Sequence, residues 1–340
     1  MDKSKSVARN SNLDLVKLFA CAAVVSLHTM RVETSLFCLV AYYLSGFAVP
    51  VFVMSGGYIM LNRGSVDWNY SIRKMTSVLK VAAIWGGILF AAQLAGDILN
   101  HTVTWQIFLY YPKLIVKGMI LQKGRLWHFW YFGALIMLYA SLPLLCRVRK
   151  YLFKVWIALV IIGGVIQAAS YVVGTPLQAY VLQTFRLWTW FQYFILGGLL
   201  GEGGLPCVLK KLSLINVKIH ALVCLLLTAV NVTFQIFAAG LLLHNLFAEY
   251  FYDSLLHMAW VTILFTLVMK LCLSERVISV IRHFAPLTMG IYILHPLLIS
   301  LISHFIALTG GLDFIVILLI SYAISLAISR IKYLNALIKL

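Results

Sequence analysis

The sequence predicts an all-helical membrane protein, a bundle of about ten transmembrane helices. Of its 340 residues, 63% are apolar and only 11% are charged, whereas about 25% of the residues of a soluble domain are charged. Apolar runs of about 18 residues or more recur along the whole chain. The runs are continuous rather than alternating, which favours helices over a β-barrel.

Ten predicted spans account for the apolar runs. The sixth is short and rich in glycine, and the seventh is long enough to tilt or kink. A single transmembrane domain is predicted over 13–330, between basic tails at 1–12 and 331–340. The spans are expected at 13–30, 38–61, 76–98, 127–145, 152–173, 186–201, 215–240, 254–273, 287–308 and 312–330.

The formal charge of +17 follows from the way cations are distributed across a membrane. If the N-terminus is cytoplasmic, most Lys and Arg residues fall in cytoplasmic segments, as the positive-inside rule requires. Both termini are therefore expected in the cytoplasm, and the expected partner is the lipid bilayer of a plasma or inner membrane rather than nucleic acid. The six cysteines are scattered, so neither a disulfide framework nor a metal site is expected.

The segment 105–125 carries most of the cations predicted on the outer side. An amphipathic helix on the outer membrane surface, with lysine side chains reaching towards water, explains this composition. The alternative is a re-entrant segment that reaches the functional site.

The first span carries three ionisable residues on one face. At 100° per residue, Asp14, Lys17 and His28 fall in a stripe about 60° wide. The other residues of the span are mostly apolar, so this stripe is expected to face the bundle interior or a cavity. About 16 Å separates Lys17 from His28 along the helix, which suits a long ligand with a cation at one end and a base at the other. An ion pair at the membrane edge explains Asp14 and Lys17 equally well, and a hydrogen-bonded core residue is the alternative for His28.

The residues around this stripe resemble the membrane acyltransferase-3 family, integral O-acetyltransferases that modify surface polysaccharides and related envelope molecules. The family pattern is Arg, ten residues, then His, and this chain has Lys17, ten residues, then His28. Lysine keeps the charge but lacks the bidentate fork of arginine. Four further segments match in order: VPVFVMSGGYIM at 49–60, LWHFWYFGALIMLYASLP at 126–143, YFILGGLLG at 193–201 and MGIYILHPL at 289–297.

The resemblance implies that cytoplasmic acetyl-CoA is the acyl donor and that an envelope carbohydrate or glycolipid is the acceptor. His28 is then the expected general base, and Lys17 is expected to line the donor channel. The family often carries two arginines three apart at the start of the third span. Here Arg73 and Lys74, with Lys80, are expected to hold the donor phosphates as point charges, although the positive-inside rule alone also explains them.

The stretch HNLFAEYFYDSLLHMAW, 244–260, offers the groups expected at the outer side. Glu249, Asp253 and His257 are four residues apart, which predicts one helix face. Glu249 or Asp253 is expected to orient His28 or hold acceptor hydroxyls, and a solvated rim is the alternative. A metal site lacks a recognised ligand spacing. The candidate acceptor-binding residues are Asp14, Trp130, Tyr139, His257 and Tyr292, whereas His295 is interpreted as a packed, hydrogen-bonded residue.

Two other classes of protein fit parts of this pattern. A transporter or flippase of envelope precursors would carry no acyl-transfer chemistry, and it would be expected to show inverted repeats and broken helices. An inactive accessory relative would explain Lys17 in place of arginine and the missing second arginine.

Overall fold

The computed structural model describes residues 9–30, 35–63, 66–201, 214–306 and 311–338, and these residues form helices and no strand. Within those ranges, eight helical segments are long and apolar enough to cross a membrane. The helices are α1 (Ser11–Thr29), α2 (Leu36–Leu44), α3 (Ala48–Met60), α4 (Trp68–Leu99), α5 (Ile107–Met119), α6 (Trp130–Arg147), α7 (Leu152–Val173), α8 (Leu187–Gly201), α10 (Val217–Leu241), α11 (Leu255–Met269), α12 (Glu275–Phe284), α13 (Thr288–Ile302) and α14 (Gly311–Arg330).

The prediction of a polytopic helix bundle is confirmed, with ten as an approximate number of spans. The sixth and eighth expected spans correspond to α8 and α11, which have 15 residues each, fewer than the roughly 20 that cross a bilayer. Most of α8 is buried among other helices. The N-terminal tail and the end of the span expected at 287–308 fall partly outside the described residues.

The third expected span begins earlier than predicted because Asp67 caps it. The Asp67 side chain accepts a hydrogen bond from the Tyr70 backbone N–H, so the helix starts at Trp68. With 32 residues, α4 is about 48 Å long, which exceeds the roughly 30 Å of a hydrocarbon core.

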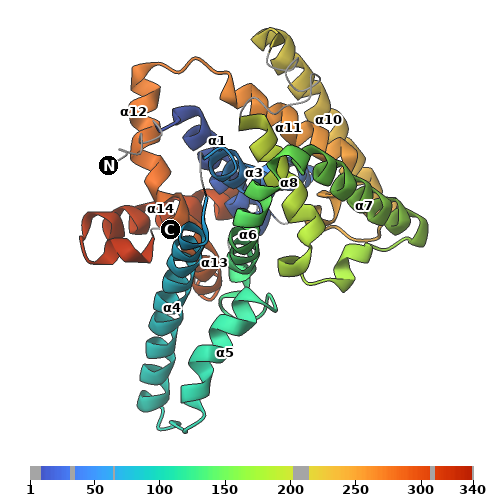
Figure 1. Ribbon diagram of the computed structural model, residues 1–340. Helices are drawn as coiled ribbons and strands as arrows, with labels where there is room; N and C mark the ends of the chain where they lie inside the picture. Colours follow the sequence, from blue (N-terminus) through green and yellow to red (C-terminus); the bar gives the residue numbers. More distant parts are fainter. Residues whose placement is uncertain (1–8, 31–34, 64–65, 202–213, 307–310, 339–340) are drawn as a thin grey trace, which may run out of the picture.

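Helix α1 runs through the centre of the bundle, and it packs against α3, α11, α12, α13 and α14. Figure 1 shows α12, α13 and α14 on one side of α1 and α7, α10 and α11 on the other, with the α4–α5 hairpin projecting away from both groups. The central position of α1 places its ionisable stripe inside the bundle.

Glycines let α3 and α8 approach almost to backbone contact. A Cβ on Gly57 would lie 1.8 Å from the Phe194 carbonyl oxygen, and one on Gly197 would lie 2.0 Å from the Met54 oxygen. Small residues at helix crossings are typical of membrane bundles. The glycine-rich stretches of the second and sixth expected spans therefore join the two helices beside the site.

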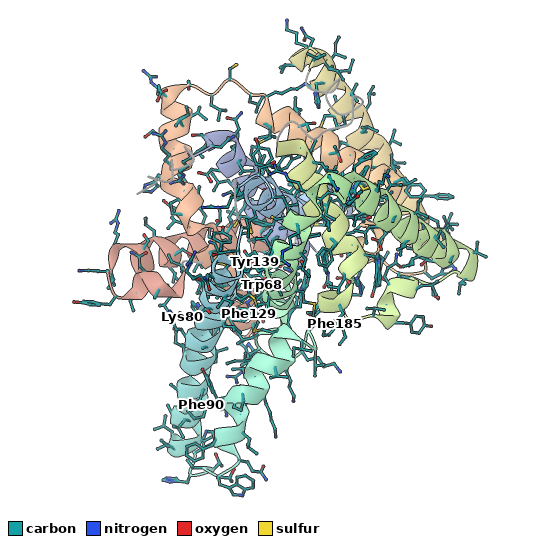
Figure 2. The ribbon with its side chains drawn as sticks, in the orientation of Figure 1. Trp68, Lys80, Phe90, Phe129, Tyr139 and Phe185 are labelled. Carbon is teal, nitrogen blue, oxygen red and sulfur yellow. The ribbon has the colours of Figure 1, made fainter. Side chains whose placement is uncertain are left out.

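The segment 105–125 contains the expected helix, α5, which packs on the second half of α4. The Tyr111 hydroxyl donates a hydrogen bond to the Ala83 carbonyl oxygen at 3.1 Å, and its ring lies 6.0 Å from that of Phe90, which Figure 2 labels on the projecting part of α4. Beyond α5 the chain turns back, and Gln122 lines the cavity described below. The end of the segment thus reaches the site, and its position relative to the bilayer stays a prediction.

Candidate active site

His28 lies in the last turn of α1 and faces a cavity that opens to the protein surface. Its neighbours Val25, Ser26 and Thr29 are buried, whereas the His28 side chain is exposed. The cavity that it faces has a volume of about 770 Å³. The imidazole is therefore surrounded by protein yet accessible to a molecule of ligand size.

The cavity wall combines aromatic and polar side chains from separate parts of the chain. They come from α1, α2, the start of α6 and the connections that precede α6, α8 and α11. A mixed wall of this kind is typical of small-molecule sites. The aromatic members are Tyr42, Trp127, Trp130, Phe247, Tyr250 and Tyr252, and the polar members besides His28 are Gln122, Gln183, Arg186, His244, Asn245 and Glu249.

Two rings fix the surroundings of the His28 imidazole. The edge of the Trp127 ring system meets it at 85°, with ring centroids 4.9 Å apart. The His295 imidazole stacks on it, with centroids 5.3 Å apart and planes 22° apart. His28 thus packs against an indole and a second imidazole.

Arg186 and Glu249 form an ion pair in the cavity wall. The Arg186 Nη1 atom lies 3.2 Å from Glu249 Oε1, and its Nε donates to the Val181 carbonyl oxygen at 3.1 Å. The guanidinium also lies over the Tyr250 ring, 5.1 Å from its centroid. Arg186 was not singled out from the sequence. Its signal was its position: a cation at the expected outer start of the span predicted over 186–201, where cations are scarce.

Asp253 does not line this cavity. Its carboxylate accepts hydrogen bonds from Thr189 Oγ1 at 2.7 Å, Trp188 Nε1 at 2.9 Å and Gln192 Nε2 at 3.2 Å, and Gln178 Nε2 lies at 3.5 Å. Burial raises the pKa of the Asp253 carboxyl, and the hydrogen bonds from Thr189 and Trp188 oppose that rise. Through these hydrogen bonds, Asp253 holds α8 against the start of α11, and it lies outside the cavity lining.

The expected helix face through Glu249, Asp253 and His257 is wrong. Glu249 lies in a 3-10 helix, Ala248–Phe251, Asp253 lies in the following turn, and α11 begins only at Leu255. Aspartate and serine hydrogen-bond readily outside helices and favour turns and caps, and the Asp253 side chain is committed to α8. The three residues therefore occupy three different environments.

The remaining acceptor-binding candidates also lie in different environments, and only one of them lines the cavity. Trp130 lines the cavity and packs on Trp190 at 5.2 Å. The Tyr292 hydroxyl donates a hydrogen bond to the His128 carbonyl oxygen, so Tyr292 supports the ring cluster beside His28. Tyr139 is buried within α6. His257 is fully buried, with its Nδ1 2.9 Å from Gln235 Nε2.

The N-terminal end of the α1 stripe, which is expected to be the inner end, is an ion-paired cluster. Lys17 Nζ lies 2.9 Å from Asp14 Oδ1, and Arg9 also pairs with the buried Asp14 carboxylate. The ion pair that was the alternative explanation of Asp14 and Lys17 is therefore present. The Lys17 side chain remains 28% exposed, so it is accessible as well as paired.

The predicted phosphate-binding cations lie along the first half of α4. Arg73 and Lys80 are exposed and Lys74 is half-buried; Figure 2 labels Lys80 on this helix. Lys74 is close enough to Arg63 for electrostatic repulsion, and the Arg63 guanidinium lies over the Tyr70 ring at 4.8 Å. Arg63, which the sequence analysis did not single out, thus adds a positive charge beside Lys74.

A family model described as an acyltransferase domain, acyltransferase-3, matches residues 10–332. The chain belongs to the acyltransferase-3 family. It is also similar to an amino-acid racemase of Enterococcus faecalis, with 24% identity over 314 residues, which cover 85% of this chain and 41% of the racemase. The chain thus spans less than half the length of that curated relative. No solved structure matches.

This acyltransferase-3 domain brings together a histidine, an aromatic wall and an ion pair around one cavity. Membership of the family supports acyltransferase activity in a multi-pass membrane protein. Among the residues that the structure describes, no group of three His, Cys, Asp or Glu side chains is placed to hold a metal ion. The acid–base candidate that faces the cavity at the end of the stripe is His28.

Proposed function

We propose that this protein is an integral O-acyltransferase of the plasma or inner membrane. It transfers an acetyl group from cytoplasmic acetyl-CoA to a hydroxyl of an envelope polysaccharide or glycolipid. The observation that supports this most is the exposure of His28 to a cavity of about 770 Å³ in a chain of the acyltransferase-3 family. The amino-acid racemase is more than twice as long as the matched part, so its named reaction is not proposed for this chain.

His28 acts as the general base in this proposal. Its neutral ring nitrogen takes the proton of an acceptor hydroxyl while that oxygen bonds to the thioester carbonyl carbon. The carbon–sulfur bond then breaks, and the CoA thiolate receives the proton from the His28 imidazolium. In the covalent variant, the neutral ring nitrogen of His28 bonds to the acetyl carbon as the carbon–sulfur bond breaks and CoA leaves as its thiolate. The acceptor oxygen then displaces the imidazole, which takes the hydroxyl proton and passes it to the thiolate.

The acceptor is proposed to bind along the wall that faces His28. Trp127 and Trp130 offer aromatic faces to a sugar ring, and Glu249 offers a carboxylate to sugar hydroxyls. Because Glu249 already pairs with Arg186, these two residues add no net charge to the wall. This favours an acceptor with hydroxyl groups over one with a strong negative charge.

The donor is proposed to enter from the opposite end of α1. Arg63, Arg73, Lys74 and Lys80 are placed to attract the CoA phosphates, and Lys17 lies between them and His28 in this route. The separation of about 16 Å along α1 is then bridged by the extended arm that carries the thioester.

Transfer of labelled acetyl groups tests the proposal. Wild-type protein in proteoliposomes, given radiolabelled acetyl-CoA and an extract of envelope glycans from the cells that express it, should release free CoA and label the glycans. His28→Gln should reduce this transfer about 10²- to 10⁴-fold, because a general base contributes that much. Mass spectrometry of the quenched protein shows whether His28 carries an acetyl group.

The control variant is His283→Gln, which changes an exposed histidine on α12 and should keep full activity. Folded wild-type protein that consumes no acetyl-CoA with any extract would contradict the proposal and favour the transporter or flippase. Equal loss of activity in both histidine variants would also contradict it, because the effect would then not be specific to the cavity.

A further inference from the structure

His295 has a fixed orientation inside α13. The residue is 0% exposed, and its Nδ1 lies 3.1 Å from the Ile291 carbonyl oxygen. A carbonyl oxygen only accepts hydrogen bonds, so Nδ1 must carry the proton of the neutral ring. The other ring nitrogen, Nε2, therefore carries a lone pair.

The Nε2 atom of His295 has no hydrogen-bond partner among the residues that the structure describes. A buried polar atom without a partner is costly and is retained where it serves a purpose. Its ring stacks on His28, the ionisable residue that faces the cavity. The imidazole that carries this unpaired nitrogen is thus packed against the proposed base.

Asp253 and Glu249, the acidic residues expected to orient His28, bind other side chains instead. Asp253 accepts hydrogen bonds from Thr189 and Trp188 of α8 and from Gln178 before it. Glu249 pairs with Arg186. A base that takes up a proton requires a neighbour that stabilises the resulting cation and fixes its ring. His295, with a free lone pair and a stacked ring, has the properties for that role.

We propose that His295 is a positioning residue for His28. Its stacked ring fixes the plane of the His28 imidazole, and the partial negative charge of its unprotonated Nε2, in a ring stacked on His28, stabilises the positive charge that develops when His28 takes the hydroxyl proton. No proton leaves His28 for His295 in this arrangement. The inference rests on the proposed function for the reaction itself, whereas the effect on the reactivity of His28 does not depend on it.

The first test separates the lone pair of His295 from its ring. His295→Phe keeps an aromatic ring and removes the lone pair, so kcat for acetyl transfer should fall about 10- to 100-fold while KM for acetyl-CoA stays unchanged. His295→Gln restores both a donor for the Ile291 carbonyl and an acceptor atom, and it should recover a measurable part of kcat. If His295→Phe keeps the wild-type kcat, or if the glutamine variant folds but recovers nothing, the proposal is wrong.

A second test needs no acyl-transfer activity. Diethyl pyrocarbonate acylates neutral imidazoles, and mass spectrometry gives the rate at His28 in the intact protein. In His295→Phe this rate should fall about tenfold, since roughly 1.4 kcal/mol of stabilisation of the developing cation corresponds to that factor. An unchanged rate overturns the role of His295 even if the wild-type protein transfers no acetyl group, which itself would count against the proposed function alone.

His220→Phe is the matched control for both tests. His220 is also buried, but its ring contacts Lys270 and the Ile263 carbonyl oxygen, away from the cavity lining. The variant measures what the loss of a buried imidazole does to the fold, and the kcat and His28 acylation rate of the folded fraction should match those of the wild-type protein. A similar fall in both quantities in His220→Phe would show that the His295 effect is merely structural.

Discussion

The two ends of α1 both carry ionisable residues on the same helical face. They differ in the partners with which those residues interact. At the inner end, Asp14 pairs with Lys17 and Arg9. At the C-terminal end, expected to be the outer one, His28 packs against two rings and faces the cavity. An ionisable residue within a span marks a candidate site, and the partners that the fold supplies decide whether it can still react.

The largest difference between the two ends is expected in catalysis. Lys17→Met removes an accessible charge from the donor route, so KM for acetyl-CoA should rise by about tenfold or less, the value of one weak charged contact, with kcat nearly unchanged. His28→Gln should lower kcat by the 10²- to 10⁴-fold given above. Initial rates over a range of acetyl-CoA concentrations separate the two effects. A larger loss of kcat in Lys17→Met than in His28→Gln would reverse the assignment of the two ends.

The next largest effect is expected on the free energy of unfolding, at Asp253, which does not line the cavity. An ionised carboxylate only accepts hydrogen bonds, which matches its donors Thr189 and Trp188. Asp253→Asn presents an amide N–H₂ to one of them, so the free energy of unfolding should fall by about 2–4 kcal/mol. Unfolding in mixed micelles of increasing SDS content measures this. Gly240→Ala is a suitable control because its Cβ would have nothing within 4 Å. A loss below about 0.5 kcal/mol in Asp253→Asn would mean that the hydrogen bonds of Asp253 do not hold α8 in place.

A smaller effect is expected at the outer ion pair. Glu249→Gln leaves Arg186, whose side chain is 6% exposed, without its counter-charge. Because Glu249 is itself partly exposed, we expect a loss of about 1–2 kcal/mol, below the 3–5 kcal/mol of a fully buried pair. The double variant Arg186→Met, Glu249→Gln should recover part of that stability. If the double variant is less stable than Glu249→Gln, the two residues do not act as a pair.

The smallest effect is expected at the inner ion pair. Asp14→Asn keeps the shape of the side chain and removes a charge whose partners, Lys17 and Arg9, are both partly exposed. The free energy of unfolding should change by about 0–1 kcal/mol, and high salt should reduce the difference further. The same SDS titration at low and high salt gives both values. A loss as large as that of Asp253→Asn would show that the two ends of α1 do not differ in the expected way.

The sequence alone predicted the elements whose signals are local. Apolar run length predicted the helix bundle, and the spacing of Asp14, Lys17 and His28 predicted that they lie within the bundle. The family resemblance, carried by five short segments, is confirmed by the match over residues 10–332. These signals depend on neighbouring residues in the chain, so they survive without knowledge of tertiary contacts.

The wall of the cavity could not be predicted because it forms through tertiary contacts. Arg186 meets Glu249 across 63 residues of sequence, and Gln122 donates to Gln183 at 2.6 Å across 61. The four-residue spacing of Glu249, Asp253 and His257 predicted a helix face, and it failed where the Asp253 side chain found partners on α8. Similarly, His295 was interpreted as a packed residue, and only the fold shows that its ring lies on His28.

The contact between α3 and α8 has a consequence for how the protein can move. With Gly57 and Gly197 each against the backbone of the opposite helix, no side chain lies between them to slide or change rotamer. The two helices should therefore shift as a single rigid body. Admission of a bulky acceptor then depends on the short turns around residues 179–186 and 244–252, which line the cavity.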